Sequence, residues 1–231
     1  MVRALLFDLD GTLAETDSVH YPAWAGILAS HGYEADWGFY QERISGRLNP
    51  EIAAELLPQL SEEERRRIIE AKEEDFRRRV GELEPLPGLV RFVERAREGG
   101  RRVALVTNAP RENALAVLRA LGLEGCFDPV VLAEDAGAGK PDPAPYRRAL
   151  RLLGVAPGEA VAFEDSPSGL RAAVAAGVPV VGVASTHDPS RLEALGAFMV
   201  VEDFTDPRLG ALLDGRGGGA RSSGRGAGRE G

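Results

Sequence analysis

Cysteine is nearly absent from this sequence: Cys126 is its single thiol, which excludes an intrachain disulfide. Long hydrophobic runs are also lacking, because no apolar stretch approaches the roughly 20 residues that a membrane-spanning helix requires. The short apolar run near the N-terminus leads into acidic residues and lacks a cleavage site of small residues, so it does not resemble a signal peptide. We therefore expect a soluble protein of the reducing cytoplasm with no membrane partner.

Lysine is the scarce basic residue, since Lys72 and Lys140 are the two lysines among 28 basic residues. The formal net charge is −8, and the segment after Asp214 carries four arginines and one glutamate, which leaves about −11 on the rest of the chain. An acidic body disfavours a nucleic-acid-binding surface, so we expect no nucleic-acid partner.

Large apolar residues are missing from residues 215–231, which consist mainly of Gly, Arg, Ser and Ala. Such a segment cannot bury enough surface to offset the entropy that ordering costs. We expect it to be a disordered and dispensable Gly/Arg-rich tail.

Apolar runs of strand length alternate with helical patterns through the rest of the chain. The runs cover residues 3–7, 103–106, 130–132, 161–163 and 178–183. Amphipathic spacing between them predicts helices over 113–121, 145–153 and 170–176, each followed by a glycine that favours helix termination. This alternation predicts an α/β fold whose core is a doubly wound, Rossmann-like parallel sheet.

The first crossover is too long for a single helix, because some seventy residues separate the first strand from the next helix and strand. Helical patterns cover residues 21–31, 39–44, 50–57 and 62–80, the last opened by a Ser61–Glu64 capping box. We predict a small helical domain over 17–84, a catalytic core over 1–16 and 85–214, and a proline- and glycine-containing hinge at 84–88.

Asp8 and Asp10 follow the first predicted strand at its carboxyl end, where ligands bind in open α/β sheets. Two carboxylates at this spacing can divide labour, one attacking phosphorus and the other transferring protons. A calcium loop is excluded, because Leu13 stands where glycine is needed and Val19 where a bidentate glutamate is needed. Taken alone, the motif still allows an ordinary turn.

Three further polar signals follow later strands. Thr107 and Asn108 can hold a phosphate oxygen or cap a helix, and Lys140 can neutralise phosphate charge or lie solvated in its loop. Glu164 and Asp165 can cap a helix or bind a cation. The residues that match the hard-oxygen preference of Mg²⁺ are Asp8, Asp165 and, through its backbone carbonyl, Asp10. Parallel topology brings all of these strand ends to one edge, which favours the catalytic reading of each.

The chain resembles the haloacid dehalogenase superfamily, whose four signatures appear in order as Asp8-Leu9-Asp10-Gly11-Thr12, Thr107-Asn108, Lys140-Pro141 and Glu164-Asp165. The similarity spans about residues 3–206, and the helical insertion resembles the superfamily's α-helical cap, which closes over the site and selects the substrate. The resemblance implies that Asp8 is the nucleophile and Asp10 the general acid and base. It also implies that Thr107 and Lys140 bind phosphate, with Asn108 beside them, and that Asp165 binds Mg²⁺ with support from Glu164.

Within that superfamily the sequence favours a phosphatase acting on a small-molecule phosphate ester of the sugar or polyol class through an aspartyl-phosphate. An acid at position 10 is needed to expel an alkoxide, whereas dehalogenases lack it. Phosphonate hydrolases require a Schiff-base lysine in the cap, and the one candidate, Lys72, has the acidic neighbours of a solvated helix face. The alternative is a phosphosugar mutase resembling β-phosphoglucomutase; a catalytically silent binding protein is a third class.

The cap offers further candidate contacts to the substrate. Arg47 and Asn49 lie between two predicted cap helices and can reach a hydroxyl, a carboxylate or a second phosphate. His20 and Trp24 are one helical turn apart and can face the site together, or pack in the interior of the cap.

Overall fold

The computed structural model describes residues 1–214, so the predicted tail lies outside the described residues. Six parallel strands form one sheet in the order β3-β2-β1-β4-β5-β6. The strands are β1 (Ala4–Phe7), β2 (Arg102–Thr107), β3 (Val130–Leu132), β4 (Ala160–Glu164), β5 (Val180–Val183) and β6 (Ala197–Val201). Strand β6 was not predicted from the sequence; it is joined to β5 through the short helix α10 (Pro189–Ala194) rather than through a full amphipathic helix.

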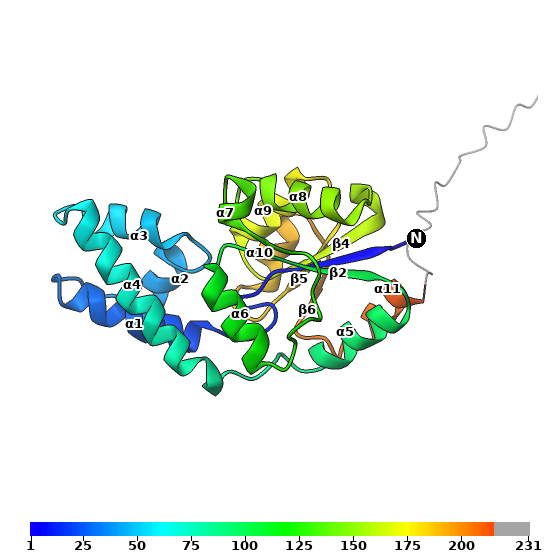
Figure 1. Ribbon diagram of the computed structural model, residues 1–231, viewed down its shortest axis with the longest axis horizontal. Helices are drawn as coiled ribbons and strands as arrows, with labels where there is room; N and C mark the ends of the chain where they lie inside the picture. The colour runs from blue at the N-terminus through cyan, green and yellow to red at the C-terminus, as the bar shows by residue number, and fades with distance from the viewer. Residues whose placement is uncertain (215–231) are drawn as a thin grey trace, which may run out of the picture.

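Helices cover both faces of this sheet. Successive side chains of a strand point to opposite faces, and because both sets are apolar here, each face must be buried. Leu5 and Phe7 of β1 pack toward α5 (Leu89–Glu98), α6 (Arg111–Ala120) and the C-terminal α11 (Gly210–Leu213). Ala4 and Leu6 pack toward α8 (Ala144–Leu153), α9 (Pro167–Ala175) and α10. Figure 1 shows the sheet between these two layers. The predicted doubly wound α/β fold is confirmed.

Four short elements complete the core and the return from the cap. They are α7 (Ala133–Ala136) and the 3-10 turns η1 (Val80–Glu82), η2 (Pro157–Glu159) and η3 (Pro207–Leu209). No helix of the described part is long and apolar enough to cross a bilayer.

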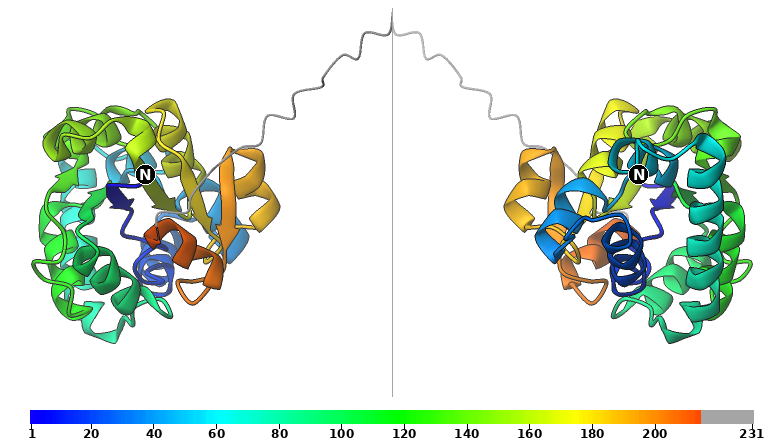
Figure 2. Two further views of the ribbon diagram at one scale, coloured as in Figure 1. Left: turned by 90° about the vertical axis from the view of Figure 1, so that its right-hand side faces the viewer. Right: turned by 90° about the vertical axis from the view of Figure 1, so that its left-hand side faces the viewer.

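The helices of the insertion form a separate group beyond the carboxyl edge of the sheet (Figures 1 and 2). They are α1 (Asp17–Ala29), α2 (Trp37–Arg43), α3 (Asn49–Leu56) and α4 (Glu62–Arg79), within a few residues of the predicted helices. Trp24, Leu28, Tyr40 and Ile52 belong to a hydrophobic cluster of their own, distinct from the two clusters of the sheet. The exact boundaries proposed after residues 16 and 84 stay predictions.

The predicted capping box fixes the start of α4. The Ser61 hydroxyl accepts a hydrogen bond from the Glu64 amide at 3.3 Å, and the Glu64 carboxylate accepts one from the Ser61 amide at 2.8 Å. Two amides that lack partners within the helix are thereby satisfied. The capping box thus defines where α4, the longest helix of the insertion, begins.

Candidate active site

The predicted strand-end residues meet where the strand order reverses. β1 lies between β2 and β4, with Phe7 level with Leu105 on one side and Phe163 on the other. Ligands of open α/β sheets bind at such a switch point. One cavity here is lined by all of the predicted core residues except Glu164, namely Asp8, Asp10, Thr107, Asn108, Lys140 and Asp165.

Lys140 is buried against two carboxylates. Its Nζ lies 2.6 Å from Asp8 Oδ1 and 2.5 Å from Glu164 Oε1, and the side chain is 3% exposed. Burial alone would lower the pKa of Lys140, but the charges of Asp8 and Glu164 outweigh it and raise that pKa. The alternative of a solvated loop lysine is therefore wrong, and Lys140 holds a positive charge beside Asp8.

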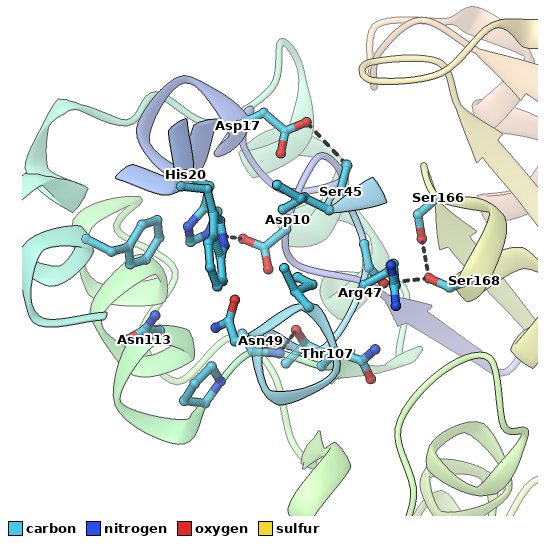
Figure 3. Close-up of a pocket in the computed structure, with 18 of the residues that line it drawn as sticks. Asp10, Asp17, His20, Ser45, Arg47, Asn49, Thr107, Asn113, Ser166 and Ser168 are labelled. Atoms are coloured by element: carbon cyan, nitrogen blue, oxygen red, sulfur yellow. Dashed lines mark hydrogen bonds and ion pairs between the residues drawn. The ribbon is translucent and has the colours of Figure 1, made fainter. Parts of the chain in front are cut away.

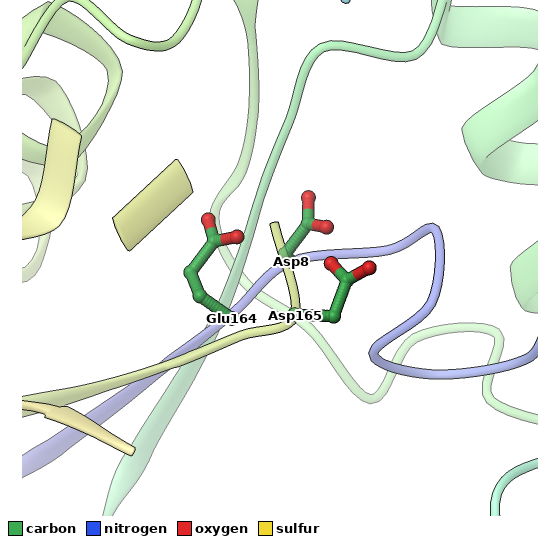
Figure 4. Close-up of side chains that lie close together, drawn as sticks. All are labelled: Asp8, Glu164 and Asp165. Carbon is green, nitrogen blue, oxygen red and sulfur yellow. The ribbon is translucent and has the colours of Figure 1, made fainter. Parts of the chain in front are cut away.

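Asp8, Glu164 and Asp165 form a compact acidic cluster, with one oxygen of each within 4.8 Å of the others (Figure 4). Burial and the charges of Asp8 and Glu164 raise the pKa of Asp165 well above its ordinary value. Asp165 Oδ1 is buried and accepts no hydrogen bond from the described residues, which is costly for a carboxylate oxygen. Hard oxygen donors with an unused lone pair fit a magnesium ion.

Gly11 explains how the loop after β1 approaches this cluster. Its φ is +72°, and a Cβ at this position would lie 2.1 Å from Asp165 Oδ2. A glycine is required there both for the left-handed backbone and for the close approach. Glu164 is turned toward Lys140 and also accepts a hydrogen bond from the Tyr146 hydroxyl.

The side chain of Asp10 is held by the start of the cap. Thr16 Oγ1 donates to Asp10 Oδ1 at 2.8 Å, and His20 Nε2 lies 3.7 Å from the same oxygen. Burial alone would raise the pKa of Asp10, but His20 and Thr16 together hold it below its ordinary value. The predicted acid/base, two residues along the chain from the predicted nucleophile, thus has its carboxylate form favoured.

Thr107 and Asn108 occupy their predicted edge but are already hydrogen-bonded. Thr107 Oγ1 accepts from the Ala109 amide at 2.9 Å. The Asn108 side chain accepts from the Lys140 amide at 2.9 Å and donates to the Lys140 carbonyl at 3.1 Å. Asn108 therefore fixes the backbone of the Lys140 loop, an arrangement that the sequence did not indicate.

Lys72 does not lie on a solvated helix face, so that prediction is wrong. The residue is 5% exposed; its Nζ donates to Glu73 Oε1 at 3.0 Å and is hydrogen-bonded to His20 Nδ1 at 2.9 Å. It also lies 5.9 Å from the centre of the Trp24 ring. The acidic neighbours of Lys72 in the sequence were misleading, because the inner face of α4 borders a polar cavity. Charged residues therefore occupy the inner face of this helix as well as its outer face.

The candidate cap residues all line the cavity (Figure 3). His20 stacks on Phe76 with ring centres 4.1 Å apart. Asn49 is the first residue of α3, and its amide donates to Glu73. The Arg47 guanidinium donates to Glu55 at 2.7 Å and to the Arg43 carbonyl at 2.8 Å, which holds it in place. Trp24 lines the cavity and is also buried in the cap cluster.

Several residues of the cavity were not identified from the sequence. Those with polar or aromatic side chains are Asp17, Tyr40, Ser45, Lys72, Glu73, Phe76, Asn113, Ser166 and Ser168. The scarcity of lysine was an available signal for Lys72, whereas the others carry no short-range pattern that separates them from surface or packing residues.

The cap rests directly on the core around this cavity. Ser168 Oγ donates to the Gly46 carbonyl at 2.9 Å, and the Gln41 amide donates to the Thr186 carbonyl at 2.9 Å. The cavity between cap and core has a volume of about 90 Å³.

A family model described as a haloacid dehalogenase-like hydrolase matches residues 2–177. The chain belongs to this family. The phosphorylated carbohydrates phosphatase of Thermotoga maritima is 34% identical over 214 residues, covering 87% of this chain and 94% of the relative. The β-phosphoglucomutase of Bacillus subtilis is 28% identical over 220 residues, covering 91% and 94%.

Solved structures agree with this family membership. The crystal structure of CbbY from Rhodobacter sphaeroides in complex with phosphate matches with a TM-score of 0.80 and 32% identity, over 93% of this hydrolase and 100% of that chain. The predicted resemblance to the superfamily, the Rossmann-like fold and the enzyme class, a haloacid dehalogenase-like phosphoric monoester hydrolase, are confirmed.

Proposed function

We propose that this hydrolase is a magnesium-dependent phosphatase of sugar or polyol phosphates that works through an aspartyl-phosphate at Asp8. The observation that carries the proposal is the arrangement at the carboxyl edge of the sheet. Asp8 contacts the Lys140 cation and shares an acidic cluster with Asp165, whose Oδ1 has no partner among the described residues. Asp10 is held two residues away by Thr16 and His20.

In the first step the Asp8 carboxylate attacks phosphorus and the bond to the alcohol oxygen breaks. Lys140 offsets the repulsion between the two anions, and Thr107 with the amides that follow it binds phosphate oxygens. Asp10 donates a proton to the departing alcohol oxygen. Free Asp10 favours its carboxylate form and so lacks this proton. The negative charge of a bound phosphate favours the protonated form of a neighbouring carboxyl, so Asp10 carries the proton once the substrate is bound.

In the second step a water molecule attacks the phosphorus of the aspartyl-phosphate. Asp10, now a carboxylate, takes a proton from that water, and the Asp8 carboxylate is released together with phosphate. Asp8, Asp165 and the backbone carbonyl of Asp10 are the proposed magnesium ligands. When bound, the cation neutralises charge on the phosphate and on the acidic cluster.

The carboxylate, amide and hydroxyl groups among the residues that line the cavity support an ester of a sugar or polyol. The relative named as a phosphorylated carbohydrates phosphatase supports the same class. His20, Arg47 and Asn49 are the proposed cap contacts to the substrate.

Replacement of the nucleophile tests the mechanism. Asp8→Asn should lower kcat for generic phosphate esters by at least about a thousandfold, because the variant cannot form the aspartyl-phosphate. A fixed-time phosphate-release assay on purified protein measures this, with the exposed N-cap variant Asp188→Asn as a control that retains activity. Undiminished turnover by Asp8→Asn would show that the nucleophile lies elsewhere.

A phosphosugar mutase is the second candidate, favoured by the β-phosphoglucomutase relative and by the cap contacts that enclose the cavity. Enclosure matters because a mutase must shield its aspartyl-phosphate from water. Isomerised sugar phosphate without phosphate release, in the presence of a sugar bisphosphate activator, would identify the mutase. Because Lys72 lies in the cavity, its position no longer argues against phosphonate chemistry; the relatives named above support phosphate esters instead.

A further inference from the structure

One wall of the cavity carries a buried carboxylate that the phosphate chemistry does not use. Glu73 on α4 is 5% exposed and accepts hydrogen bonds from residues of three elements. Oε1 accepts from the Asn49 amide of α3 and from Lys72 Nζ at 3.0 Å, and Oε2 accepts from the Asn113 amide of α6. Glu73, Asn49 and Asn113 all line the cavity, and Asn113 belongs to the core rather than to the cap.

These cavity-lining side chains retain hydrogen-bonding capacity. A carboxylate has about four acceptor positions, and the described residues occupy three of those on Glu73. Each asparagine amide has a second N–H. Asn49 Oδ1 accepts no hydrogen bond from the described residues, whereas Asn113 Oδ1 accepts one from Arg77 at 3.0 Å. The wall therefore offers acceptors and donors side by side.

Hydroxyl groups match this pattern, because each hydroxyl donates one hydrogen bond and accepts others. The Lys72 cation balances the buried Glu73 carboxylate, so this pair offers no net positive charge to attract a phosphate or carboxylate. The wall thus selects for a neutral, hydroxylated part of a ligand.

The position of the wall relative to Asp10 agrees with binding of a neutral, hydroxylated part of the ligand. Lys72 Nζ contacts both Glu73 and His20, and His20 Nε2 lies 3.7 Å from Asp10 Oδ1. Glu73 and the proposed leaving-group acid therefore lie on the same side of the cavity. An alcohol whose oxygen meets Asp10 extends from there toward the cap.

We infer that Glu73, Asn49 and Asn113 form a subsite that binds neighbouring hydroxyls on the alcohol portion of the substrate. The inference rests on the proposed phosphatase function and adds the chemical feature by which the enzyme selects its ester. Glu73 is the specificity-determining residue of this subsite, with Lys72 balancing its charge.

Glycerol phosphate and n-propyl phosphate provide a matched pair of probes, because they are three-carbon esters with and without two free hydroxyls. The wild-type enzyme should prefer glycerol phosphate in kcat/KM by about tenfold or more, as expected for hydrogen bonds to a charged group. Glu73→Gln should lower kcat/KM for glycerol phosphate at least about tenfold, and its loss on n-propyl phosphate should be several-fold smaller. Glu74→Gln is the control, since Glu74 is exposed on the same helix and should leave both values unchanged.

The outcomes that would contradict the hydroxyl subsite differ from the outcome that would contradict the phosphatase function. A wild-type preference near one, or an equal loss on both esters in Glu73→Gln, would overturn the hydroxyl subsite and leave a contact that only joins cap and core. Wild-type protein that cleaves neither these esters nor p-nitrophenyl phosphate would instead contradict the phosphatase assignment. If Glu73→Gln does not fold, the wild-type preference and its reduction in Asn49→Ala decide the question.

Discussion

Asp17 is a carboxyl buried where the first cap helix begins. It is 6% exposed, and its Oδ1 accepts a hydrogen bond from the Tyr40 hydroxyl at 2.7 Å. Burial raises the pKa of Asp17 even though the Tyr40 hydrogen bond opposes it. A carboxyl whose pKa is higher in the folded state stabilises the fold when protonated, and this stabilisation is lost as the pH rises through the folded pKa.

Asp17→Asn should therefore be more stable than the wild type near neutral pH, because the amide keeps the acceptor oxygen without the charge. The gain should shrink as the pH falls toward the ordinary aspartate pKa of about 3.9. Thermal unfolding followed by circular dichroism at several pH values between these limits measures it. Glu34→Gln, an exposed cap substitution, is the control and should show no such trend. A gain that is independent of pH would contradict the assignment of a buried charge.

The two lysines show what single residues reveal in the sequence. Both are buried beside carboxylates, Lys140 against Asp8 and Lys72 against Glu73. Scarcity of lysine indicated a role for Lys140 because a strand end was adjacent, whereas the same signal at Lys72 was overridden by its charged neighbours. Apart from Glu73, the carboxylate and imidazole partners of both lysines are 24 or more residues distant in the chain, so residue type alone could not identify them.

At the scale of elements, the N-terminus of α9 packs closely against Glu164 at the carboxyl end of β4. Gly169 lies in its first turn, and its amide donates to the Ser166 hydroxyl at 3.1 Å. A Cβ on Gly169 would lie 1.8 Å from Glu164 Oε2. The helix can approach β4 this closely only because the residue has no side chain.

Gly169→Ala should consequently destabilise the protein by about 1–3 kcal/mol through overpacking, although alanine normally favours a helix. It should also lower activity, because displacement of Glu164 disturbs Lys140 and Asp8. Gly26→Ala in α1 is the matched control: no atom lies within 4 Å of its added Cβ, and it should stabilise by up to about 1 kcal/mol. Urea unfolding of both variants measures the difference, and equal shifts would show that Gly169 has room for a methyl group.

Element types were largely predictable where a periodic pattern and a stop signal coincided. The five predicted strands and the four cap helices are present, most of them with shifted ends, and Ser61 with Glu64 predicted the start of α4 correctly. The sixth strand was missed because only a short helix precedes it. The inner face of α4 was misjudged because burial against a polar cavity leaves no hydrophobic periodicity.

At the scale of the whole molecule, strand order determines what the sequence could predict about the site. Parallel topology alone gathers residues 8, 107, 140 and 165, which the chain places far apart. The placement of the cap depends instead on contacts such as Ser168 with Gly46 and Glu73 with Asn113. These contacts join the cap to the core, and no sequence motif links the residues that make them. The cap side of the cavity was therefore only partly predicted.

A bound cation should act on the stability of the whole protein. Burial and the charges of Asp8 and Glu164 raise the pKa of Asp165, so ionised Asp165 costs stability near neutral pH. Mg²⁺ that binds the folded state alone stabilises it by roughly 2.7 kcal/mol at 100 times Kd, or roughly 5–10 °C in Tm. Asp165→Asn should raise Tm in the presence of a chelator, because it removes the unfavourable charge, and should abolish the increase that Mg²⁺ causes.

Differential scanning calorimetry with and without Mg²⁺ measures both effects, and the exposed variant Glu84→Gln is the control that should keep the full magnesium response. An undiminished response in Asp165→Asn would place the cation at another site. Activity that survives exhaustive chelation would contradict the need for magnesium, whatever the calorimetry shows. Because stability and activity are measured separately, loss of the cation can be distinguished from loss of the fold.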